Sequence, residues 1–189
     1  DMEFCNLSEV VVRAEDDLDT LLDKVETATW LGIIQSSFTY FPYLRESWKK
    51  NCDVEALLGV SLTGQMDNPS VLTSDALKAL KSRVLRISRK ASGIMGTKMP
   101  AATTCVKPSG TVSQLVDSAS GVHPRYSQHY IRRYRISGND PLFQLMKKSG
   151  IKATPEVGQD KKNASTWVLE FPVKAPDNCI TRKDVTALD

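Results

Sequence analysis

The segment at residues 107–113 has the residue types of a phosphate-binding loop. It reads Lys-Pro-Ser-Gly-Thr-Val-Ser. A glycine at position 110 lets the backbone approach a ligand closely, and small hydroxyl residues offer both N–H and O–H donors. If consecutive amides point the same way, they form a cradle for phosphate. The segment lacks the G-x-x-x-x-G-K-[ST] pattern of a Walker A loop, and an ordinary strand-to-helix turn explains it equally well.

A second segment, residues 120–135, combines basic and aromatic side chains. It contains four arginines, three tyrosines and two histidines. Such a mixture can serve phosphate and base contacts, so nucleic acid is one possible target. The alternative is a strand whose outward arginines are simply solvated. His123, between Gly121 and Pro124, fits a turn better than a catalytic base.

The cysteines are the remaining candidates for chemistry. The four cysteines are Cys5, Cys52, Cys105 and Cys179. They are scattered and form no C-x-x-C pair, which argues against a structural zinc site. Scattered cysteines also fit a reducing cytoplasm. From its surroundings alone, Cys5 reads as a buried, inert thiol before an apolar run. Glu3 and Glu9 would raise its pKa rather than lower it.

Composition bounds the class of protein. The chain has 189 residues, 41% hydrophobic and 25% charged, which is the size and balance of one ordinary globular domain. No apolar run approaches the roughly 20 residues of a membrane helix, so we expect no membrane partner. The net charge of +3 combines −9 over residues 1–75, +11 over 76–139 and +1 over 140–189. The basic middle either faces a polyanion or is a solvated helix face.

Hydrophobic patterns predict strands and helices that alternate along the chain, which is typical of α/β architecture. We expect 1–189 to be a single segment without internal repeats. Predicted strands are at residues 10–13, 57–62, 101–106, 130–136 and 167–173. Predicted helices run over 16–36, from Thr73 or Ser74 to the glycines at 93 and 96, and from Asp140-Pro141 to Gly150. Residues 41–43 should stop the first helix, and 154–165 should be a surface loop.

Six short segments, in this order, resemble the monomeric, adenosylcobalamin-dependent (class II) ribonucleoside-triphosphate reductases. They are CNLSEV at 5–10, GVSLTG at 59–64, VKPSGTV at 106–112, GVH at 121–123, DPL at 140–142 and EFPVK at 170–174. The resemblance implies an enzyme that reduces ribonucleoside triphosphates to 2′-deoxyribonucleoside triphosphates for DNA synthesis. It also implies a ten-stranded α/β barrel around a finger loop that carries a thiyl-radical cysteine. Cobalamin homolysis generates that radical.

The resemblance assigns roles to two parts of this sequence. Cys5 matches a redox-active disulfide partner that supplies electrons to the 2′ carbon and is re-reduced by thioredoxin or an equivalent. The family's loop that binds the substrate's phosphates is matched here by Pro108, Ser109, Gly110, Thr111, Val112 and Ser113. We expect this loop to form a tight turn with its amides directed into the barrel. Contacts to adenosylcobalamin are not assignable, and no metal ligand is expected. Nucleic acid is not an expected partner of such an enzyme.

The family's finger-loop motif, Asn-Pro-Cys-Gly-Glu, does not occur in this sequence. We therefore expect an incomplete half of the barrel, with the thiyl cysteine and the partner of Cys5 in a chain upstream of Asp1. The alternative is a non-catalytic module that binds nucleotide or nucleic acid through residues 76–139. A free-standing module should complete its own sheet, whereas half a barrel leaves an open edge and an exposed apolar face.

Overall fold

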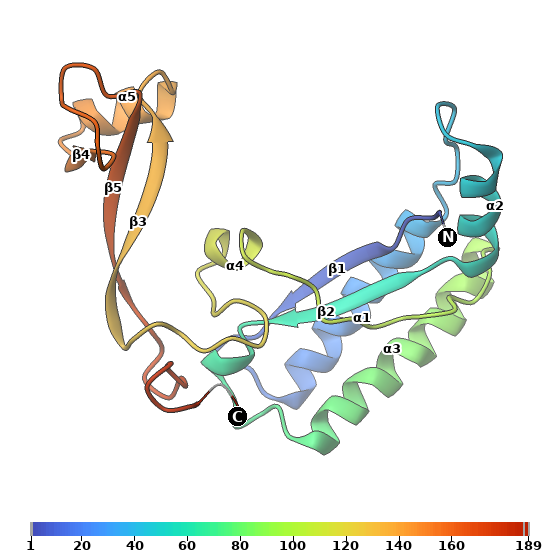
Figure 1. The fold of residues 1–189 in the computed structure, drawn as a ribbon. Helices are drawn as coiled ribbons and strands as arrows, with labels where there is room; N and C mark the ends of the chain where they lie inside the picture. Colours follow the sequence, from blue (N-terminus) through green and yellow to red (C-terminus); the bar gives the residue numbers. More distant parts are fainter. Residues whose placement is uncertain (1, 187, 189) are drawn as a thin grey trace. The chain divides into compact units, whose positions relative to one another are not determined.

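Two parallel strands and two long helices build the larger of two compact units (Figure 1). The computed structural model describes residues 2–186 and 188. The larger unit contains the chain up to Arg125 and again from Pro176, and the smaller unit is Tyr126–Ala175. Both units combine strands with helices, and the predicted α/β class is confirmed. No helix among the described residues is long and apolar enough to cross a membrane.

In the larger unit, β1 (Asn6–Val11) pairs in parallel with β2 (Leu58–Thr63) over six residues. The connection between them contains α1 (Leu18–Ser36) and α2 (Glu46–Glu55). A short 3₁₀ turn, η1 (Gln65–Asp67), follows β2 and leads to α3 (Ser74–Met95). Because a parallel pair needs a long crossover, the intervening helices are what brings β1 and β2 side by side.

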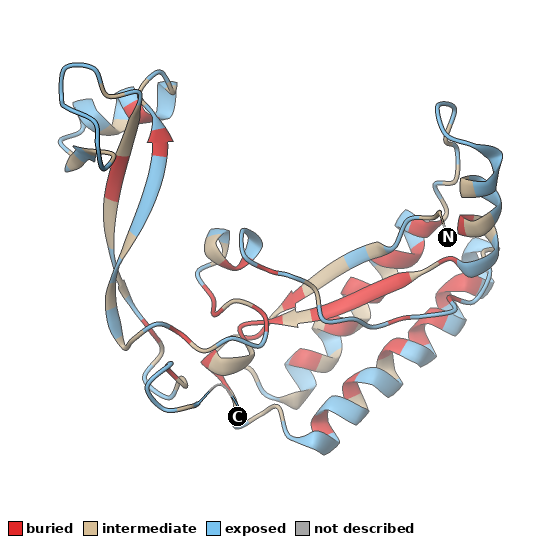
Figure 2. Ribbon diagram, in the orientation of Figure 1, coloured by how far each residue is buried: buried red, intermediate tan, exposed pale blue. Residues whose placement is uncertain are grey.

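The core of this unit lies between the strands and helices α1 and α3. Figure 2 shows buried positions recurring along both helices. The cluster comprises Val10, Val12, Leu21, Val25, Ala28, Val60, Leu80 and Val84. Since side chains alternate along a strand, the opposite face of β1 and β2 carries Leu7, Glu9, Gly59, Ser61 and Thr63. Helices α1 and α3 both pack on the other face.

Capping residues mark the boundaries of both long helices, and two of them, Thr73 and Gly96, were expected from the sequence; Gly93, also expected to end this helix, lies inside α3. Asp17 caps α1 through a capping box with Thr20, and Thr73 caps α3 by accepting from the amide of Ala76. Gly96 ends α3 with a left-handed φ of 70°. Helix α2 was not predicted: it buries only Cys52 and has no side-chain N-cap, so neither periodicity nor a cap reveals it.

The predicted strand at residues 101–106 is wrong as a regular strand. This segment runs beside β2, and the amides of Leu58 and Val60 donate to the carbonyls of Ala102 and Thr103. A regular parallel ladder uses carbonyls two residues apart, so accepting at consecutive residues breaks the register. One bridge remains, between Val60 and Thr104.

The smaller unit is a three-stranded antiparallel sheet with one helix. Its strand order is β3 (His129–Ser137), β5 (Thr166–Lys174), β4 (Ala153–Pro155), and α5 (Pro141–Lys148) follows β3. The predicted start of α5 is confirmed, with Asp140 as N-cap and proline at the first helical position. The predicted loop at 154–165 is corrected at its start, because residues 154 and 155 pair with β5.

Phe143 should carry much of the stability of the smaller unit. Its side chain is 1% exposed and stacks on Trp167 with ring centroids 5.3 Å apart. Phe143→Ala should lower the unfolding free energy of this unit by about 3–5 kcal/mol, measured by hydrogen exchange of the β3 and β5 amides. Leu145→Ala on the same helix removes an exposed side chain and is the control. Unchanged protection in Phe143→Ala would contradict this packing.

Candidate active site

The face of β1 and β2 opposite helices α1 and α3 carries the predicted site residues in successive rows across the strands. The register places Leu7 opposite Gly59, Glu9 opposite Ser61 and Val11 opposite Thr63. The irregular segment beyond β2 continues each row with residues 105, 107 and 109, as the contacts below show. Thiols therefore lie at one end of this face, an ion pair in the middle, and the predicted phosphate loop at the other end.

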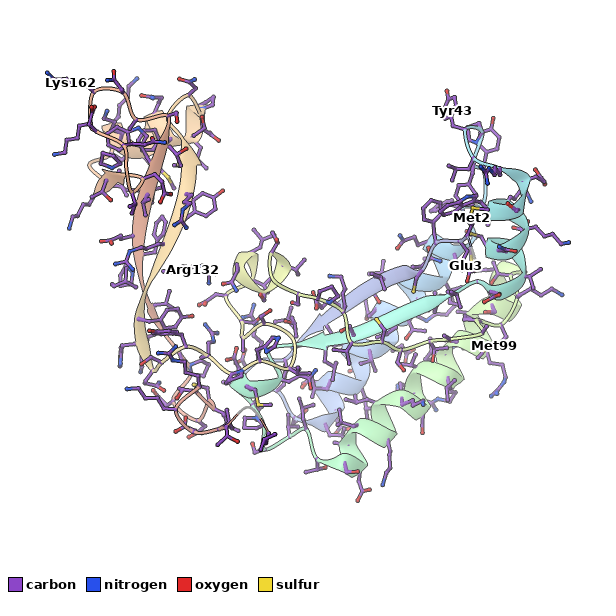
Figure 3. All side chains as sticks on the ribbon, in the orientation of Figure 1. Met2, Glu3, Tyr43, Met99, Arg132 and Lys162 are labelled. Atoms are coloured by element: carbon purple, nitrogen blue, oxygen red, sulfur yellow. The ribbon has the colours of Figure 1, made fainter. Side chains whose placement is uncertain are left out.

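At the thiol end, two cysteines share the space above a glycine. A Cβ at Gly59 would lie 3.3 Å from the sulfur of Cys5, 2.7 Å from that of Cys105 and 2.5 Å from Cδ2 of Leu7. Only a residue without a side chain leaves room for both sulfurs. Cys5 directly precedes β1, after Met2 and Glu3, which are labelled in Figure 3. Cys5 and Cys105 are exposed, and neither is in a disulfide.

Cys105 was missed from the sequence. Its spacing in the sequence could have indicated it. Cys105 stands two residues before Lys107 and four before Ser109, so in an extended segment all three side chains lie on the same face. Without the pairing to β2, nothing in the sequence links it to Cys5.

Both thiols are held in their protonated form. Partial removal from water raises the pKa of Cys5, and the neighbouring Cys105 and Glu3 raise it further. Partial burial also raises the pKa of Cys105, where Lys107 opposes and Glu9 adds to the effect. These groups are therefore thiols rather than thiolates at neutral pH.

An ion pair occupies the middle of the face. Lys107 Nζ donates to Glu9 Oε2 at 3.1 Å, and the Lys107 amide donates to Ser61 Oγ at the same distance. The Glu9 side chain is 4% exposed, and its Oε1 has no partner among the described residues. Lys107 is thus fixed through both its side chain and its backbone just before the loop begins.

The loop itself turns from the extended segment into α4 (Val112–Leu115). The expected turn into a helix is confirmed, although the helix has only four residues. Ser109 and Ser113 are buried, while Gly110, Thr111 and Val112 are exposed. Among the described residues, the amides of these three exposed residues meet no acceptor. Three successive free N–H groups can bind an anion.

The Ser109 hydroxyl does not serve as a free donor. Thr63 Oγ1 donates to the Ala119 carbonyl at 3.0 Å and lies 2.7 Å from Ser109 Oγ. Because Thr63 has a single hydroxyl proton, Ser109 must donate its own proton to Thr63. The loop therefore offers a ligand its amides and the Thr111 hydroxyl, and uses Ser109 to anchor itself to β2.

A cavity of about 450 Å³ adjoins the loop, lined by residues 106–110 on one wall and 120–123 on the other. The second wall is a turn in which the His123 amide donates to the Ser120 carbonyl at 2.8 Å. The interpretation of His123 as a turn residue is thus confirmed. Its exposed side chain also lines the cavity, which the sequence did not predict.

The arginines at 132, 133 and 135 lie on β3 in the smaller unit. Arg133 pairs with Glu170 at 3.0 Å, and Arg135 pairs with Glu156. The other concentration of basic residues in 76–139 is on α3, where Arg83 pairs with Glu26 at 2.7 Å. The basic stretch is thus divided between two units, and several of its charges are neutralised locally.

The fold matches part of a solved ribonucleotide reductase. A solved structure titled as a B12-dependent (class II) ribonucleotide reductase superposes with a TM-score of 0.72. The match covers 95% of this chain and 29% of that chain at 24% sequence identity, and shows the fold. No family model matches the chain.

Curated relatives of this chain share one name. The adenosylcobalamin-dependent ribonucleoside-triphosphate reductase of Levilactobacillus brevis is 37% identical over 97 residues, which is 51% of this chain and 12% of that protein. The proteins of the same name from Lactobacillus leichmannii and Euglena gracilis are 31% identical over 96 residues and 38% identical over 84. They are matched over 12% and 11% of their lengths, and cover 51% and 44% of this chain. The resemblance to adenosylcobalamin-dependent ribonucleoside-triphosphate reductases is confirmed, over a small part of their length.

The perturbed thiols lead to a prediction about pH. Alkylation of Cys5, followed by mass spectrometry of its peptide, should rise at a pH above the ordinary cysteine value of about 8.5. Once Cys105 is ionised its charge disfavours the thiolate of Cys5, so Cys105→Ser should lower the Cys5 pKa and move the rise in alkylation to a lower pH. Cys179→Ser is the control and should change nothing at Cys5. An inflection at or below the ordinary value would contradict the described environment.

Proposed function

We propose that this chain is part of the catalytic barrel of a ribonucleotide reductase that converts ribonucleoside triphosphates to 2′-deoxyribonucleoside triphosphates. The observation that carries the proposal is the shared face of β1 and β2, with Cys5 at one end and residues 107–113 at the other. The names of the curated relatives support the same substrate class.

The geometry suggests how the substrate lies. Gly59 and Thr63 are four residues apart on β2, about 13 Å along the strand. A ligand whose anionic end binds the free amides at 110–112 must extend along this strand to bring its other end to the thiols. In this orientation the triphosphate occupies the cavity, the ribose lies over the Glu9–Lys107 pair, and the 2′ carbon faces Cys5.

Cys5 acts as a reductant in this proposal. The 2′ hydroxyl leaves as water while Cys5 and a second cysteine, elsewhere in the full enzyme, lose two electrons and form a disulfide. Thioredoxin or an equivalent dithiol then reduces that disulfide. The raised pKa of Cys5 suits this role, because the group must carry a proton as well as electrons to the substrate.

Adenosylcobalamin supplies the radical that starts the reaction when it is bound. The exposed apolar side chains of Phe4 and Leu7 beside Cys5 are compatible with a large apolar cofactor face. In this proposal the described residues bind the phosphates, orient the ribose and hold the reducing proton at Cys5 Sγ.

The remaining barrel walls come, in this proposal, from the rest of a longer cytoplasmic reductase chain. The segment 1–189 would then be the C-terminal portion of a ten-stranded barrel, with the thiyl cysteine upstream. Three observations support this reading over a free-standing module. The chain spans 12% of the length of the Levilactobacillus brevis relative, and β1 has an unpaired edge among the described residues. Leu7 and Val106 are also exposed.

The phosphate role of the loop can be tested at Gly110. A Cβ there meets no atom within 4 Å, so Gly110→Val should leave the fold unchanged and obstruct only an approaching ligand. In the full-length enzyme we expect KM for the nucleoside triphosphate to rise about tenfold or more. Gly93, on α3, is equally open, and Gly93→Val is the matched control. An unchanged KM would count against a close backbone contact.

The 189-residue chain made alone should have no reductase activity, even with adenosylcobalamin and a dithiol. Radical transfer requires a cysteine held close to both substrate and cofactor, and proximity supplies much of the rate. The assay is deoxynucleotide formation from a ribonucleoside triphosphate, with the full-length enzyme as positive control. Turnover above that of a Cys5→Ser chain would show that the radical cysteine has been misplaced.

A further inference from the structure

A buried ion pair lies just beyond the cavity wall, in a part of the chain to which the proposed chemistry gives no role. Arg125 Nε donates to Asp67 Oδ1 at 2.8 Å, and Nη2 donates to Oδ2 at 2.9 Å. Both side chains are 4% exposed. Taking two charges out of water costs several kcal/mol per ion, and an apolar pair of the same volume often serves stability as well. What the ion pair offers instead is a fixed, two-bond geometry.

The ion pair holds the segment that leads to the second wall of the cavity. The Ala119 amide donates to Asp67 Oδ2 at 2.9 Å. From the other side, Arg125 donates to the carboxylate and the carbonyl of Asp117, each at 2.9 Å. Asp117 adopts a left-handed φ of 47°, a conformation that is uncommon in residues other than glycine. Residues 117–119 are thus clamped at both ends.

Hydrogen bonds continue from this clamp to the phosphate loop. The Ala119 carbonyl accepts from the Gly64 amide at 2.8 Å and from the Thr63 hydroxyl. The Gly121 amide donates to Thr63 Oγ1 at 2.9 Å, and Ser109 is bonded to the same oxygen. One buried hydroxyl therefore joins the turn on one wall of the cavity to the loop on the other.

We propose that Asp67 and Arg125 are positioning residues of the nucleotide site. Their ion pair fixes the turn at 119–123, and through Thr63 it sets the distance between that turn and the amides at 110–112. The inference rests on the proposed function, since it takes the cavity to be the site of the triphosphate. Neither side chain needs to touch the substrate, because both act through Ala119 and Thr63.

The test uses the full-length reductase and separates position from stability. Arg125→Lys keeps the charge but loses the two-bond geometry, and Asp67→Asn keeps the shape but loses the charge. Thr63→Val leaves the ion pair intact and removes the shared hydroxyl, while Thr63→Ser restores it. Arg83→Gln, which breaks the ion pair with Glu26 on the helices, is the matched control.

We expect KM for a ribonucleoside triphosphate to rise about tenfold in Arg125→Lys, Asp67→Asn and Thr63→Val, with a smaller change in kcat. Thr63→Ser should restore KM, and Arg83→Gln should leave it unchanged. Thermal unfolding identifies which variants are folded. If both ion-pair variants misfold, Thr63→Val still tests the connection between the turn and the loop. A folded ion-pair variant with a lower Tm but an unchanged KM overturns the inference, as does an unchanged KM in Thr63→Val.

Gly110→Val tells the two failures apart. If it raises KM while the ion-pair variants do not, the loop still binds the phosphates and only the positioning role is lost. If Gly110→Val also leaves KM unchanged, the cavity is not the triphosphate site and both proposals fall together.

Discussion

The site depends on the parallel register between β1 and β2. With Leu7 opposite Gly59 and Glu9 opposite Ser61, the polar and small residues of both strands share one face, while Val10 and Val60 share the core. A slip of one residue in either strand would turn its buried side chains outward and its site residues into the helices. Because a change of register would expose the core to water, the core itself keeps the thiols aligned with the loop. No separate contact between the thiols and the loop is needed.

Most side chains on this face are polar, and a few shared atoms make several of their hydrogen bonds. Thr63 is fully buried and its single hydroxyl serves the Ala119 carbonyl, the Gly121 amide and Ser109. Buried groups of this kind stabilise a structure only when every donor has an acceptor, so each member constrains the others. The free amides of the loop stand out against this background, because the neighbouring hydroxyls of Thr63 and Ser109 are already hydrogen-bonded.

The sequence predicted those features that local chemistry decides. Thr73 and Asp140 were predicted as helix starts and Gly96 as a helix end, because capping depends only on neighbours in the chain. Family-like segments pointed to Cys5 and to the loop. Long-range pairing was out of reach: Cys105 reaches Cys5 only because an irregular segment runs beside β2 across Gly59. The Asp67–Arg125 pair joins residues 58 apart in the chain, and no periodicity encodes it.

The chain enters and leaves the smaller unit at neighbouring points within the larger one. The Arg125 amide bonds to the Ile180 carbonyl, and the Arg182 amide returns a bond to the Arg125 carbonyl. Inside the smaller unit, Gln128 and Ala175 close its base with two hydrogen bonds. A segment joined in this way behaves as an insertion. Its length and surface can diverge between homologues while the two strands that carry the thiols and the loop keep their register.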